Sequence, residues 1–183
     1  IKGDLCILDS FFSSAWFSIL GDVLQQTNKI DEIRIIASFQ KILSFRDVHP
    51  LDKVDVFRSH IGRFGKLKGK SMKMMISKNF DNKKNETNIH DRFVISNGNI
   101  WNFISSDTLK KGDRADIFRT RNPKTIDDDL KRFEKLWNDE GNYEINGKKN
   151  NMFKKLNTDL SQVYEDRMEE ERQKRIKDIS KED

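Results

Sequence analysis

Residues 89–98 form the stretch IHDRFVISNG, and residues 99–105 continue as NIWNFIS. The first run holds the apolar residues Phe93, Val94 and Ile95 between polar residues, which is typical of a short β-strand. Its last two residues, Asn97 and Gly98, are the pair most typical of a two-residue hairpin turn. The stretch therefore predicts two antiparallel strands in the middle of the chain.

The segments before this hairpin alternate strand-like and helix-like patterns. The apolar runs DLCILDSFF and DEIRIIASF are each followed by a segment with helical spacing, SSAWFSILGDVLQQ and HPLDKVDVFRSHIGRF. A further strand is expected in SMKMMIS, another in ADIFRT, and a last helix in TIDDDLKRFEKLWNDE. This order predicts an α/β fold with a mixed sheet flanked by helices.

The end of the chain has a different composition. Leu156, Leu160 and Val163 keep helical spacing, and the residues after them are almost wholly charged. Mixed charges of this kind are typical of a solvated helix or a frayed tail. We therefore expect an α/β domain over residues 1–140, then a linker and a charged helical tail over residues 141–183.

The net charge of the chain is +5, and it is unevenly distributed. Residues 165–183 hold 8 acidic and 6 basic side chains, a net of −2, which leaves +7 on residues 1–164. A basic body favours a polyanion such as nucleic acid as a partner. The single Cys6 excludes a disulfide within the chain and favours a cytoplasmic setting. No run approaches the roughly 18 apolar residues of a membrane span.

Further domains or subunits outside this chain are compatible with the sequence, which does not begin with methionine.

The hairpin carries residues that suit phosphate chemistry. Alternation along a strand puts His90 and Arg92 on one face and Phe93 on the other. Histidine can act as a nucleophile or general acid–base near neutral pH, and a guanidinium binds phosphate oxygens through two parallel hydrogen bonds. After the turn, the second strand would return Ser105 and Ser106 toward His90.

The pattern His90-x-Arg92-x4-Asn97-Gly98, followed by the serine segment, resembles the HxKxxxxDG and GSxN signature of the phospholipase D superfamily. The resemblance implies a phospholipase D-like mixed sheet. It also implies that His90 forms a phosphohistidine, that Arg92 holds the phosphate, and that Ser105 or Ser106 contacts it. It implies no metal and no other cofactor.

The chain departs from that signature in several places. Asn97 replaces the aspartate, which removes a carboxylate from the third catalytic position of the motif. Ile104 stands at the small-residue position, and in that register Asp107 would meet the phosphate. A shift of one residue avoids this repulsion, and both registers stay open. Lys110 and Lys111 would supply positive potential in either register.

The chain has one copy of the motif, because neither His49 nor His60 is followed by the pattern. The resemblance therefore implies a homodimer that joins two motifs across a two-fold axis, unless a partner motif lies on further sequence. The expected function is that of a metal-independent phosphodiesterase, a hydrolase of the nuclease type rather than a lipase. The alternative is a catalytically degenerate module for nucleic-acid binding or dimerisation in a larger assembly.

Overall fold

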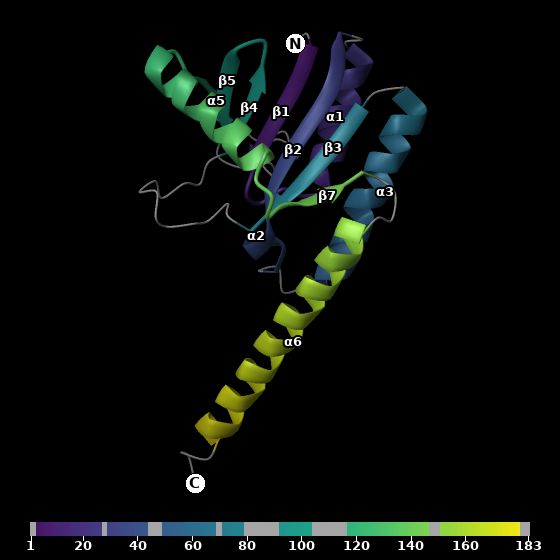
Figure 1. Cartoon of the computed structure of the whole chain (residues 1–183), viewed down its shortest axis with the longest axis vertical. Helices are drawn as coiled ribbons and strands as arrows, with labels where there is room; N and C mark the ends of the chain where they lie inside the picture. Colours follow the sequence, from purple (N-terminus) through teal and green to yellow (C-terminus); the bar gives the residue numbers. More distant parts are fainter. Residues whose placement is uncertain are drawn as a thin grey trace.

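The computed structural model describes residues 3–26, 29–43, 49–68, 71–78, 92–103, 117–146 and 151–179. Within these ranges one sheet of seven strands has the order β6-β5-β4-β1-β2-β3-β7, with helices on both sides (Figure 1). The strands are β1 (Gly3–Asp9), β2 (Ile30–Ser38), β3 (Ser71–Ser77), β4 (Arg92–Ser96), β5 (Asn99–Phe103), β6 (Ile117–Arg119) and β7 (Tyr143–Ile145). The helices are α1 (Ala15–Gln26), α2 (Phe39–Leu43), α3 (Pro50–Lys68), α5 (Pro123–Trp137) and α6 (Asn151–Ile179).

The sheet is mixed, as the sequence predicts. Strands β1, β2 and β3 are parallel to one another. On the other side of β1, β4 is antiparallel to β1, β5 to β4, and β6 to β5. The predicted hairpin is confirmed, because β4 and β5 pair from Ser96 and Asn99 outward. Asn97 and Gly98 have φ values of 56° and 70°, the left-handed conformation that this turn requires.

The two faces of the sheet bury separate apolar clusters because side chains alternate along each strand. In β1, Leu5 and Ile7 join the larger cluster, which α1, α3 and the start of α6 cover. Cys6 and Leu8 join the smaller cluster under α5. Burial also raises the pKa of the Cys6 thiol to about 11, as suits a core residue.

The body extends beyond the division expected at residue 140. Strand β7 pairs with β3 at one edge of the sheet, and Phe153, Leu156 and Leu160 of α6 are buried in the larger cluster. The three residues of β7 lie among glycine, asparagine and lysine residues, which are typical of a loop, so the sequence did not indicate this strand.

Beyond Leu160, α6 has no buried residue and projects past the sheet to Ile179 (Figure 1). The expected charged tail is therefore a continuous helix as far as the structure describes it. Across the described ranges, every helix falls short of the length and apolarity that a membrane crossing requires.

Candidate functional site

Polar residues gather where the three parallel strands end. Asp9 ends β1, Ser38 ends β2 and Ser77 ends β3, and all three are fully buried. Arg92 begins β4 and lies opposite Asp9, because β4 runs antiparallel to β1. We call these four residues the carboxyl edge. In open α/β sheets, ligands bind outside the carboxyl ends of the parallel strands.

Asp9 is the centre of a buried polar cluster at this edge. The indole Nε1 of Trp16 donates to Asp9 Oδ2 at 2.7 Å, and the backbone N–H of Phe11 donates to Oδ1 at 2.9 Å. Arg92 Nε lies 3.2 Å from Oδ1, and only 11% of the Arg92 side chain is exposed. A buried carboxylate requires such partners, because an uncompensated charge in the interior is costly.

The ring of Phe11, next to this cluster, lies close to two cations. The guanidinium of Arg92 lies 4.7 Å from the centre of the Phe11 ring, and Lys41 Nζ of α2 also lies 4.7 Å from it. Cations are attracted to the faces of aromatic rings at such distances. The ring therefore holds two positive charges close to the carboxyl edge, which suits an anionic ligand.

A second polar cluster joins the end of β3 to α6. Lys78 Nζ donates to Asp159 Oδ2 at 2.6 Å, and the Tyr143 hydroxyl donates to the same oxygen. The hydrogen bond from Lys78, and then that from Tyr143, hold the pKa of Asp159 below its usual value. Burial alone would lower the pKa of Lys78, but its hydrogen bonds raise it. This cluster fixes α6 to the sheet.

Asn97 lies away from the carboxyl edge. Strand β4 runs from Arg92, opposite Asp9, to Ser96, opposite Leu5. At about 3.3 Å per residue, the turn is roughly 16 Å from Arg92, at the amino ends of the parallel strands. The structure therefore does not bring Arg92 and Asn97 together. The left-handed backbone accounts for asparagine at this position.

The other predicted site residues, His90, Ser105, Ser106, Lys110 and Lys111, lie outside the described residues. Arg92 is thus the one predicted site residue that the described structure places at the carboxyl edge.

The sequence analysis did not identify Asp9, Ser38 and Ser77 at the carboxyl edge, nor Trp16 and Lys41 beside it. Asp9 did carry a signal, because it ends the apolar run LCILD just before a helix-like segment. The carboxyl end of the first strand in a β-α-β order is a preferred ligand position. In the described ranges no group of three or more His, Cys, Asp or Glu side chains could hold a metal ion.

No family model matches the chain, and no curated protein sequence matches it either.

Proposed function

We propose that the chain is a metal-independent phosphodiesterase, a cytoplasmic nuclease that binds a substrate phosphate at the carboxyl edge and uses His90 as its nucleophile. One observation carries the proposal: β4 begins at Arg92 opposite the last residue of β1. The strand of the HxR motif therefore enters the sheet at the edge where α/β folds hold their ligands. His90 precedes Arg92 by two residues in the sequence.

The proposed fold is that of the phospholipase D superfamily. The parallel strands β1, β2 and β3, with the antiparallel β4–β5 hairpin beside β1, support it. Many unrelated proteins share an α/β sheet, so the strand arrangement alone does not identify this fold. The residues of the motif are needed beside it.

In the proposed reaction a ring nitrogen of His90 attacks the phosphorus, and the bond to the leaving oxygen breaks. The histidine of a second copy gives that oxygen a proton, and water then cleaves the phosphohistidine to regenerate the imidazole. The positive charges of Arg92 and Lys41 would stabilise the charge that develops on the phosphoryl oxygens. Asp9 would act as a positioning residue that fixes the Arg92 guanidinium.

One observation favours the alternative, a nucleic-acid-binding module that does not turn over. Arg92 forms an ion pair with a fully buried carboxylate and is itself mostly buried. Such a pair offsets part of the positive charge that a phosphate clamp needs. In this alternative, Arg92 secures β4 to β1, and the exposed cations of the basic body bind the polyanion.

Cleavage of single-stranded DNA and RNA in the presence of EDTA distinguishes the two functions. For the nuclease we expect wild-type turnover that EDTA leaves unchanged, its loss in His90→Ala, and wild-type rates in Lys131→Ala. Lys131 is a suitable control because its side chain is 73% exposed on α5. Fluorescence anisotropy would measure binding by the same variants. Binding without cleavage by the wild-type protein would favour the alternative, and cleavage abolished by EDTA would contradict the metal-independent reaction.

A further inference from the structure

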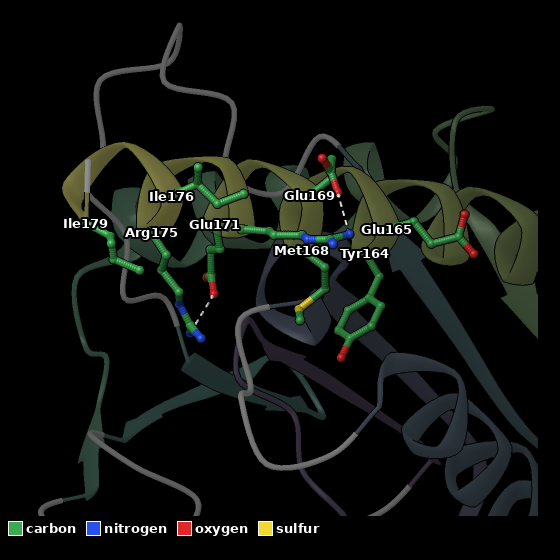
Figure 2. A pocket seen from close by; sticks show the side chains of 9 residues that line it. Tyr164, Glu165, Met168, Glu169, Glu171, Arg175, Ile176 and Ile179 are labelled. Atoms are coloured by element: carbon green, nitrogen blue, oxygen red, sulfur yellow. Dashed lines mark ion pairs between the residues drawn. The ribbon is translucent and has the colours of Figure 1, made fainter.

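The projecting half of α6 has one face on which apolar and charged residues are ordered along the helix. An open hollow follows this face, and the described residues that line it all belong to α6 (Figure 2). They are Tyr164, Glu165, Met168, Glu169, Glu171, Arg172, Arg175, Ile176 and Ile179. Residues three and four positions apart lie on the same side of a helix, so these nine form one continuous face. We call it the α6 face.

The α6 face exposes large apolar side chains at both of its ends. Met168 is 50% exposed, Ile176 52% and Ile179 66%. All three belong to the α6 face, so a second helix that covered this face would remove them from water.

The charges on the α6 face are separated by sign. Its first half carries Glu165, Glu169 and Glu171, and its second half carries Arg172 and Arg175. Two parallel copies of this face would set like charges against each other. Two antiparallel copies would set the acidic half of each against the basic half of the other, which is the arrangement that attraction favours.

We propose that the α6 face binds the same face of a second copy of this chain, antiparallel, about a two-fold axis that passes between the two helices at the level of Glu171 and Arg172. Near this axis Glu171 of each copy lies next to Arg172 of the other. Toward each end, Tyr164 and Met168 of one copy pack against Ile176 and Ile179 of the other. The contact is isologous, as a two-fold dimer requires.

Pairs within each helix do not use up these charges. Arg172 Nη1 lies 4.0 Å from Glu169 Oε2, and Arg175 Nη2 lies 3.9 Å from Glu171 Oε2 (Figure 2). All four side chains are more than half exposed, and exposed pairs at this distance contribute little. The same side chains can therefore reach across to a second copy.

The antiparallel arrangement also determines how the two bodies face each other. Helix α6 projects past the carboxyl ends of β1, β2 and β3 (Figure 1), and Arg167 Nη2 donates to Gln40 Oε1 of α2 at 3.1 Å. Arg167 is about four and a half residues from the axis, or roughly 7 Å along the helix. The two carboxyl edges would thus face one another across the axis. A shared active site needs this orientation, but the pairing is argued from α6 alone and does not rest on the proposed chemistry.

Charge reversal on the α6 face tests the pairing by light scattering and sedimentation of the full chain. The variants Glu169→Lys with Glu171→Lys, and Arg172→Glu with Arg175→Glu, should each raise the dimer Kd about tenfold or more. An equimolar mixture of the two should restore wild-type dimerisation, because opposite halves again meet. The matched controls reverse charges off the face: Asp166→Lys with Glu170→Lys, and Lys174→Glu with Lys177→Glu.

The contact between two α6 faces is small compared with a standard protein–protein interface, which buries about 1,600 Å². We therefore expect a micromolar dimer that weakens in high salt. A wild-type chain that stays monomeric at roughly 100 μM would overturn the pairing. Controls that dissociate the dimer as strongly as the face variants, or a mixture that fails to reassociate, would overturn it equally. Circular dichroism would verify that every variant keeps the helicity of the wild type.

Discussion

Arg92 Nε lies 3.2 Å from Asp9 Oδ1, so the first residue of β4 is held by the last residue of β1. The carboxylate is fully buried and also accepts hydrogen bonds from Trp16 and from the backbone of Phe11. This ion pair connects the predicted phosphate motif to the edge of the sheet where the parallel strands end.

Removal of one partner of this pair should be strongly destabilising. Arg92→Met leaves the Asp9 carboxylate buried beside fewer partners, and we expect it to lower the free energy of unfolding by about 3 kcal/mol. The double variant Asp9→Asn, Arg92→Met removes both charges and should recover part of this loss. Urea unfolding of the wild type, both single variants and the double variant gives the coupling energy. A coupling energy near zero would show that the pair does not hold β4.

Asn97 should affect the turn and not the chemistry. Asn97→Val places a β-branched residue at a φ of 56° and should cost about 1 to 2 kcal/mol in thermal or urea unfolding. Asn97→Asp and Asn97→Gly suit the same turn and should be nearly neutral. Because the turn lies roughly 16 Å from Arg92, we expect Asn97→Asp to leave nuclease turnover unchanged. A rise in the rate would show that position 97 acts on the site after all.

The sequence predicted the β4–β5 hairpin because a short apolar run and an Asn-Gly turn are both local features. It predicted the α/β class in the same way, and also the strand in ADIFRT, which is β6. The pairing of Asp9 with Arg92 is not local. It depends on β4 inserting beside β1 in antiparallel register, and no spacing along the chain specifies that neighbour.

Asn97 is the opposite case, a residue close to Arg92 in the sequence and far from it in the structure. It follows Arg92 by only five positions, yet an extended strand carries it to the opposite edge of the sheet. The short spacing between Arg92 and Asn97 in the motif therefore did not predict that the two residues lie close together in space.

The cluster of Lys78, Tyr143 and Asp159 should contribute an acid-sensitive part of the stability. The folded protein holds the pKa of Asp159 below its usual value, so this contribution is present above the unfolded carboxyl pKa of about 3.9. It is lost as the pH falls through the folded pKa. Asp159→Asn should cost only about 1 kcal/mol at pH 7, because Lys78 is 44% exposed and water partly screens its charge. The cost should be smaller below pH 4, where the wild-type carboxylate becomes protonated. Urea unfolding across this pH range would measure it, and an equal cost at every pH would contradict the assignment.

The two halves of α6 should differ in their contribution to stability. Removal of residues 165–183 should leave the melting temperature of the dilute protein nearly unchanged, since no described residue beyond Leu160 is buried. Leu160→Ala in the full chain should cost about 2 to 5 kcal/mol, because Leu160 is fully buried. Differential scanning calorimetry would compare them. A large loss on truncation would show that the projecting half packs against the body.

Trapping the covalent intermediate tests the role of His90 most directly. Enzyme in excess would be mixed with a single-stranded oligonucleotide in EDTA, quenched during the first turnover, digested and mapped by mass spectrometry. We predict a phosphoryl-linked nucleotide on the peptide that contains His90, and none in His90→Ala. Cleavage of the oligonucleotide that proceeds equally well in His90→Ala, with no adduct on the His90 peptide of the wild type, would contradict the proposed nuclease.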